Sequence, residues 1–157
     1  MSVAIPPNAP AAWLSAVGGW TVGDLYEGER RMLAMQTPEG DDAAVLFVGR
    51  DKNSATNWTY GIPVEKLRVV THVVLFVEDA DYGMLVIPAD VLRKLQGRSG
   101  VSHEDGRWRV GVDWFPESNG GRPTLAPIGA RHLKEDVWGY FVAGPPTSLS
   151  DWYRSRP

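Results

Sequence analysis

Hydrophobic residues recur along this chain in short runs, separated by segments rich in Pro, Gly, Asp and Asn. Residues 31–36 and 43–48 are two such runs, and the segment TPEGDD lies between them. Apolar runs that flank a turn-forming segment of this kind predict a β-hairpin. The same pattern predicts further strands at residues 20–22, 58–62 and 84–87.

Two longer runs have different patterns. Residues 69–77, VVTHVVLFV, are almost continuously apolar and mostly β-branched. Such a run is typical of a strand that is buried on both faces. Residues 107–115, RWRVGVDWF, instead alternate, so that Trp108 and Trp114 point to the same side as the two valines between them. This alternation predicts a strand with one buried and one solvent-facing side.

Helices are predicted between these strands. A first helix over residues 11–17 follows Pro10, a short helical turn covers 63–68, and a helix runs from 88 to 97. We also expect a helix over residues 128–140. The resulting order of elements predicts an α/β protein of the mixed α+β type, with a central mixed β-sheet flanked by helices.

The chain has 157 residues, the usual size of one domain, and it contains no repeat and no long linker. We therefore expect a single domain. Within it we distinguish a core over residues 11–95, a C-terminal extension over 96–143, and an extended tail over 144–157.

Composition narrows the function classes. The chain has no cysteine, which excludes disulfides, thiolate catalysis and cysteine-based zinc sites. Its formal net charge of −3 provides no overall basic field, which counts against a dedicated nucleic-acid-binding protein. The N-terminus lacks the features of a secretory signal, and no apolar segment approaches the roughly 20 residues that span a bilayer. We expect a soluble, cytoplasmic protein with no membrane partner.

Common catalytic and metal-binding motifs are missing from the sequence. It contains no GxSxG or SxxK nucleophile motif, no P-loop and no strand-borne GxGxxG. His72, His103 and His132 lie far apart, and none has a metal-ligand partner three or four residues away. The residues therefore predict no catalytic group, no metal site and no cofactor.

Four features between residues 11 and 95 follow one another in a distinctive order. They are a helix exit with Trp13, Leu14, Gly19, Trp20 and Val22, a hairpin over 31–48, the residues Asp51, Lys52 and Asn53 leading to Trp58, and the segment VVLFVEDADYGMLVIPADVL at 73–92. This order resembles the PD-(D/E)xK nuclease-like superfamily. The resemblance implies a restriction-endonuclease-like core and a bacterial or phage protein in a defence-related system.

The catalytic residues of that superfamily are not matched. The position of its first-strand Asp falls at residues 31–33, and its (D/E)xK triplet falls at 47–49 or 48–50. Neither alignment supplies the carboxylates that hold Mg²⁺ or the lysine that stabilises the developing charge. The resemblance therefore implies a degenerate site. A metal site rebuilt from Glu27 or Glu29 with Asp51 stays open, although solvated turn carboxylates explain these residues more simply.

Two groups of residues are candidates for binding. Under the resemblance, the loop after the hairpin faces nucleic acid or a partner, where its cations could pair with phosphates and its tryptophan could stack. The acidic turn at residues 78–83 would oppose a nucleic acid. Near the C-terminus, aromatic and basic residues suit a docked tail or a self-association arm. The two candidate sites are Arg50, Lys52, Asn53, Asn57 and Trp58, and Trp152, Tyr153 and Arg154.

These observations together predict a non-catalytic binding protein with a degenerate nuclease-like fold. We expect it to engage a protein partner or a second copy of itself as a homodimer. The alternatives are a Mg²⁺-dependent nuclease whose carboxylates have moved, a nucleic-acid-binding protein that uses residues 50–58, and an unrelated immunity or inhibitor protein.

Overall fold

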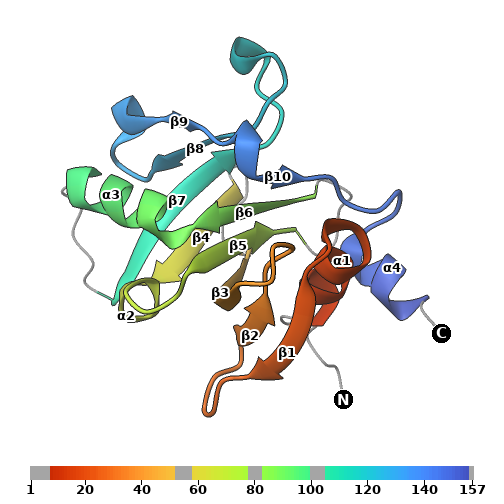
Figure 1. Ribbon diagram of the computed structural model, residues 1–157. Helices are drawn as coiled ribbons and strands as arrows, with labels where there is room; N and C mark the ends of the chain where they lie inside the picture. The colour runs from red at the N-terminus through yellow and green to blue at the C-terminus, as the bar shows by residue number, and fades with distance from the viewer. Residues whose placement is uncertain (1–7, 52–57, 78–82, 100–104, 156–157) are drawn as a thin grey trace.

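The computed structural model describes residues 8–51, 58–77, 83–99 and 105–155 (Figure 1). Within these ranges the chain forms two β-sheets and four α-helices, so the predicted mixed α+β class is confirmed. The arrangement differs from the expected single central sheet, because the strands divide between a larger and a smaller sheet.

The larger sheet has six strands in the order β1-β2-β3-β5-β6-β10. Its strands β3 and β5 are parallel, and all other neighbours are antiparallel. The predicted hairpin is confirmed as the pair β2 and β3. The strands are β1 (Thr21–Leu25), β2 (Met32–Gln36), β3 (Asp42–Gly49), β5 (His72–Phe76), β6 (Met84–Pro88) and β10 (Phe141–Val142).

The smaller sheet has four antiparallel strands in the order β4-β7-β8-β9. Most of its strands come from the region after residue 100, which therefore builds a second sheet together with β4 and adds only β10 to the first sheet. The strands are β4 (Trp58–Pro63), β7 (Arg107–Asp113), β8 (Thr124–Pro127) and β9 (Glu135–Asp136).

The helices are α1 (Asn8–Gly18), α2 (Val64–Leu67), α3 (Ala89–Ser99) and α4 (Leu149–Arg154), with 3₁₀ turns η1 (Glu117–Asn119), η2 (Arg131–Leu133) and η3 (Trp138–Tyr140). The first three helices lie where the sequence predicts them. The expected helix over residues 128–140 is wrong. Gly129 adopts a left-handed φ of 87°, and the rest of the segment forms η2, β9 and η3.

The expectation of an extended tail is also wrong, because residues 149–154 form α4. The Ser148 side chain caps this helix by accepting a hydrogen bond from the Asp151 backbone N–H at 3.1 Å. Leu149 is buried under the helix against the first sheet, and Trp152 packs beside it. A local cap and an apolar anchor thus stabilise a helix that begins shortly after two prolines.

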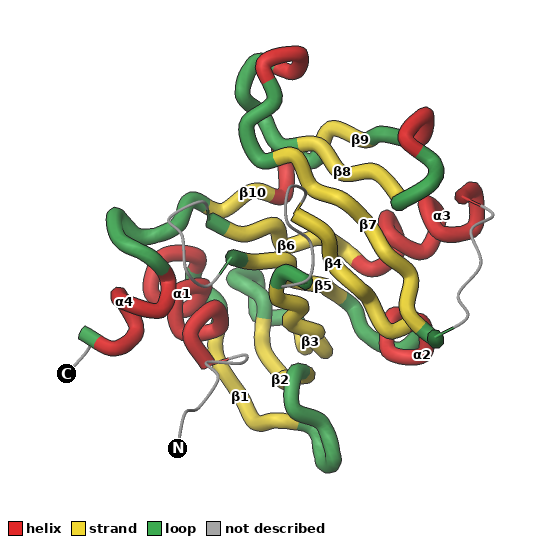
Figure 2. The backbone as a smooth tube through the Cα atoms, turned by 180° about the vertical axis from the view of Figure 1, so that it is seen from behind, coloured by secondary structure: helices red, strands yellow, loops and turns green. Residues whose placement is uncertain are grey.

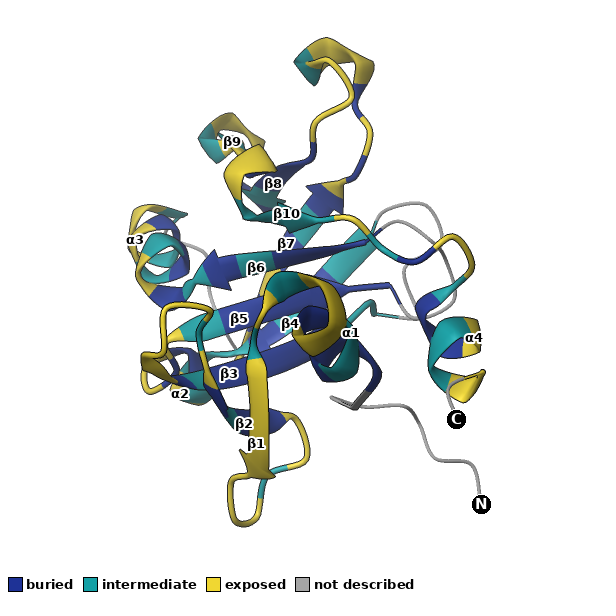
Figure 3. Ribbon diagram, turned by 45° about the vertical axis from the view of Figure 1, so that its right-hand side comes forward, coloured by how far each residue is buried: buried dark blue, intermediate teal, exposed yellow. Residues whose placement is uncertain are grey.

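Two apolar cores cover the two faces of the six-stranded sheet. On one face, Val45 and Phe47 of β3 pack with Leu14 of α1 and Leu149 of α4. On the other face, Leu46 and its neighbours pack against the smaller sheet, with further contacts from α2 and α3. The six-stranded sheet is therefore the middle layer of the molecule, and the four-stranded sheet is an outer layer (Figures 1 and 3).

Candidate functional site

The smaller sheet has one covered face and one open face. Along β7, Trp108, Val110 and Val112 are buried against the larger sheet, while Arg107, Arg109 and Asp113 are exposed on the opposite side. Figure 2 shows the molecule from behind, with β4, β7 and β8 in view and no described helix lying across them. A groove of about 710 Å³ lies on this side of the molecule.

The floor of the groove is made of small residues. Gly111 of β7 pairs with Ala126 of β8, and both line the groove at positions that alternate with buried ones. A Cβ atom at Gly111 would lie 3.3 Å from Cδ1 of Ile128, so the absence of a side chain there leaves the space that Ile128 borders. The groove exists because the two strands carry small residues where larger polar ones would fill it.

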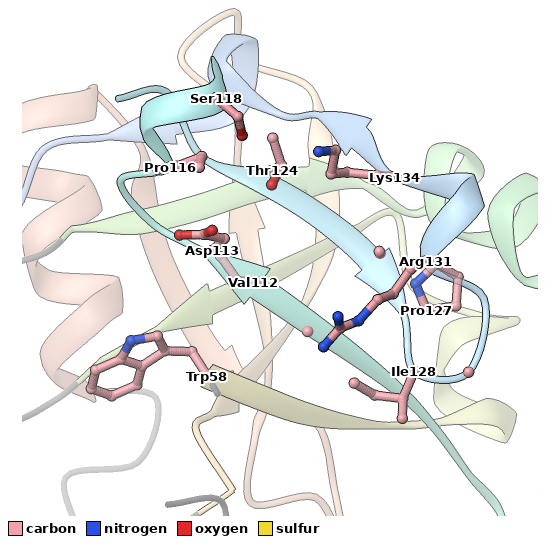
Figure 4. Close-up of a pocket in the computed structure, with 13 residues that line it drawn as sticks. Trp58, Val112, Asp113, Pro116, Ser118, Thr124, Pro127, Ile128, Arg131 and Lys134 are labelled. Atoms are coloured by element: carbon pink, nitrogen blue, oxygen red, sulfur yellow. The ribbon is translucent and has the colours of Figure 1, made fainter. Parts of the chain in front are cut away.

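One wall comes from the connection between β8 and β9. The Ile128 N–H donates to the carbonyl of Arg109 at 3.0 Å, and Gly129 then turns the chain with its left-handed φ. The following 3₁₀ turn carries Arg131, and Lys134 comes directly after it. These local hydrogen bonds place both cations beside the groove (Figure 4).

The other wall comes from the connection between β7 and β8, which contributes Pro116 and Ser118. Asp136 of β9 holds this connection in place, because it accepts a hydrogen bond from the Asn119 side chain at 3.2 Å and pairs with Arg122 at 3.4 Å. The backbone N–H of Trp138 also donates to Asp136 at 2.9 Å. That hydrogen bond, with the one from Asn119, lowers the pKa of Asp136.

The charges in the groove have no ion-pair partner among the described residues. In the part of the chain that the structure describes, Arg131, Lys134 and Asp113 form no ion pair. Arg109, on the same face, differs, since it hydrogen-bonds to Asp105 and lowers the pKa of that carboxyl group to about 2. The groove therefore offers a ligand two cations and one carboxylate that no described residue compensates.

Trp58 lies at the end of the groove away from Arg131 and Lys134 (Figure 4). The Arg50 guanidinium lies over its ring, 4.4 Å from the ring centroid, which is a cation–π contact. Beneath them, burial raises the pKa of Tyr60, an effect that the neighbouring Trp114 indole and Arg50 only partly offset. Tyr60 donates to the Phe76 carbonyl at 3.3 Å, which ties this end of the groove to the larger sheet.

Of the residues proposed for the first candidate site, the structure brings Arg50 and Trp58 together. Lys52, Asn53 and Asn57 lie outside the described residues. The cations on the far side of the groove, Arg131 and Lys134, were not predicted. Two signals in the sequence point to them, a glycine at a solvent-facing position of an alternating strand and a Gly-containing turn that ends in basic residues.

The second candidate site, at the C-terminus, is mainly an internal contact. Trp152 packs edge-on against Trp13, with ring centroids 4.8 Å apart. Tyr153 packs against the core between α1 and the larger sheet. Arg154 pairs with Asp151 of its own helix at 3.3 Å. This arrangement fits the docked tail, which was one of the two interpretations of these residues.

The position expected for a nuclease triplet is apolar where the structure describes it. Gly49 pairs with Phe76, whose ring would lie 3.5 Å from a Cβ atom at Gly49. Glu29 forms an ion pair with Lys66. No group of three or more His, Asp or Glu residues that could hold a metal occurs within the described ranges. The residues around Gly49 thus do not fit a Mg²⁺ ion, which needs converging oxygen ligands.

Within the described ranges, the histidines belong to no cluster that could hold a metal. His72 is half-buried, contacts the Trp20 ring edge-on at 5.2 Å and lies 2.9 Å from the Thr71 hydroxyl. Burial lowers its pKa. His132 is exposed in η2, and His103 is outside the described residues.

None of the helices in the described ranges has the length and apolar character needed to span a bilayer. Comparisons with protein-family models, curated proteins and solved structures found no match to this chain. The nuclease-like resemblance and the defence-related setting therefore stay predictions from the sequence.

Proposed function

We propose that this protein is a non-catalytic binding protein and that it engages a protein partner through the groove on the open face of the smaller sheet. The observation that carries this proposal is the groove itself, a cavity of about 710 Å³ with a floor of Gly111 and Ala126. Concave sites with a few uncompensated polar groups are the usual places where proteins bind ligands.

The distribution of charge and shape supports binding more than catalysis. Arg131 and Lys134 lie on one side of the groove, and Asp113 lies across from them (Figure 4). The described residues that line the groove include no histidine that could act as a base for Ser118. Such a site can select a ligand by shape and charge.

The proposal can be tested with a groove that is filled by mutation. Ala126→Phe places a large side chain on the groove floor at a strand position that tolerates aromatic residues. Ala16→Phe is the matched control, because Ala16 is exposed on α1, on the other side of the molecule. Random peptides displayed on phage are selected against the wild-type protein and then tested for binding to both variants.

We expect the selected peptides to bind the wild-type protein and Ala16→Phe equally, and to lose binding to Ala126→Phe. Circular dichroism and thermal unfolding of each variant show that the fold is intact. Peptides that bind Ala126→Phe as well as they bind the wild-type protein would contradict the proposal.

A second candidate function is nucleic-acid binding along residues 50–58, and the stacked pair of Arg50 and Trp58 favours it. In that case a thymidine oligonucleotide should bind, and Arg50→Ala should weaken its binding and reduce the salt dependence. Binding of the oligonucleotide that does not depend on Arg50 would exclude this function for the 50–58 edge.

A further inference from the structure

The groove has two chemically different ends. Arg131 and Lys134 line the end formed by the β8–β9 connection, whereas Asp113 and Trp58 line the opposite end (Figure 4). Ile128 and Pro127 provide apolar surface beside Arg131 (Figure 4). A ligand that satisfies the whole groove must therefore place negative charge at one end only and apolar surface next to it.

The two cations give this end of the groove positive charge that a carboxylate can bind. Both side chains are exposed and neither forms an ion pair with a described residue of this chain, so no ion pair with a described residue has to break when a ligand binds. An arginine can bind both oxygens of a carboxylate, and a lysine elsewhere in the groove can donate a charge-assisted hydrogen bond to a second acceptor. The Ser118 and Thr124 hydroxyl groups, which also line the groove, can donate further hydrogen bonds.

A nucleic-acid strand fits this arrangement poorly. Its phosphates repeat along the chain, and a strand lying along the groove would bring one of them close to the Asp113 carboxylate. The floor of Gly111 and Ala126 has no aromatic ring on which bases could stack. A peptide can carry one acidic side chain and also donate a hydrogen bond from a backbone N–H group to Asp113.

From these observations, and resting on the function proposed above, we infer that the partner presents an acidic peptide segment. One Asp or Glu side chain of that segment binds Arg131, and Lys134 adds longer-range attraction for the acidic segment. A neighbouring apolar residue packs on Ile128, and a backbone N–H of the segment donates to Asp113.

Two degenerate pentapeptide mixtures test this inference, one with Glu and one with Gln fixed at the central position. Both mixtures are acetylated and amidated so that their termini carry no charge. Binding is followed through the ¹⁵N–¹H amide signals of Gly111, Ala126 and Gly129. We expect the Glu mixture to bind about tenfold more tightly than the Gln mixture, as the loss of one charge-assisted hydrogen bond predicts.

The double variant Arg131→Ala and Lys134→Ala should remove this preference for Glu. Lys94→Ala is the control, because Lys94 is an exposed cation on α3 that does not line the groove. The preference should also shrink when the salt concentration rises from about 50 mM to about 500 mM, because salt screens exposed charges.

Equal binding of the Glu and Gln mixtures at the groove would overturn the acidic-peptide inference and leave the proposed function standing. If hexathymidylate shifts the groove amides and neither peptide mixture does, both the inference and the proposed function fail. Groove amides that shift when the protein alone is concentrated would identify a second copy as the occupant and overturn the inference.

Discussion

The two sheets of this protein differ in how many of their faces are covered. The six-stranded sheet is packed on both faces, and its central strand β5 is buried at four successive positions from Val73 to Phe76. The four-stranded sheet is packed on one face only, and exposed and buried positions alternate along its strand β7. The first sheet therefore provides stability, while the second has a free face on which a binding site can form.

This difference also explains where the groove lies. A strand buried on both faces can vary little, because each side chain fills a space in a close-packed core. On the open face of β7 and β8, Gly111 and Ala126 leave space without opening a cavity in the core. Mutations at buried and open positions of the same sheet should thus have very different consequences.

The largest expected effect is on stability, at the interface between the sheets. Trp108 is fully buried there, and Trp108→Ala should lower the free energy of unfolding by about 3–5 kcal/mol. Arg107→Ala, at the next position but on the open face, should change it by less than about 0.5 kcal/mol. Urea unfolding of both variants measures the contrast. Similar losses of stability in the two variants would mean that the face of β7 that carries Arg107 is also packed.

A smaller effect is expected at the other covered face. Trp152→Ala should cost about 1–3 kcal/mol, because the ring is half-buried against Trp13 and helps to hold α4 on the larger sheet. Arg154→Ala, on the same helix, removes only an exposed ion pair and should cost less than about 0.5 kcal/mol. Thermal unfolding compares the two. An unchanged melting temperature in Trp152→Ala would show that the tail does not contribute to this core.

Acid should lower the free energy of unfolding through His72. Burial lowers the pKa of His72 in the folded protein, so below about pH 6.5 the unfolded chain binds this proton more readily than the folded chain. The free energy of unfolding should therefore fall as the pH decreases from neutral, and His72→Gln should reduce this slope. His132→Gln, which alters an exposed histidine, is the control and should keep the slope. Equal slopes in all three proteins would exclude His72 as the source.

The smallest effect on stability is expected in the groove. Arg131→Ala and Lys134→Ala should each change the free energy of unfolding by less than about 0.5 kcal/mol, because both side chains are exposed and form no ion pair with a described residue. Their effect should appear in binding alone. A clear loss of stability in either variant would show that these cations support the fold.

The sequence predicted much of this architecture, because the hydrophobic pattern reflects burial directly. Within the runs at residues 69–77 and 107–115, β5 and β7 are confirmed as a doubly covered strand and a singly covered strand, although they are shorter than the predicted runs. The helix expected at 128–140 was wrong because backbone groups of this segment hydrogen-bond outside it. The Val137 N–H, for example, donates to the carbonyl of Pro123.

Less of the candidate site could be predicted from the sequence. Arg50 and Trp58 were identified, but Arg131 and Lys134 line the same groove as Trp58 only because β4, β7 and β8 are neighbours in one sheet. That pairing joins segments that are distant along the chain, so no local sequence pattern predicts it. The groove floor depends on a Gly and an Ala being paired across two strands, which is also a property of the register.

The most direct test of the account is to map where a peptide binds. The backbone amide signals of the ¹⁵N-labelled protein are followed while the Glu-centred peptide mixture is added. We predict that the shifts concentrate on Gly111, Ala126 and Gly129, and that the amides of α1 and α4 stay unchanged. Shifts that concentrate around Trp13 and Trp152, with the groove amides unmoved, would contradict the claim that the open face of the smaller sheet is the binding face.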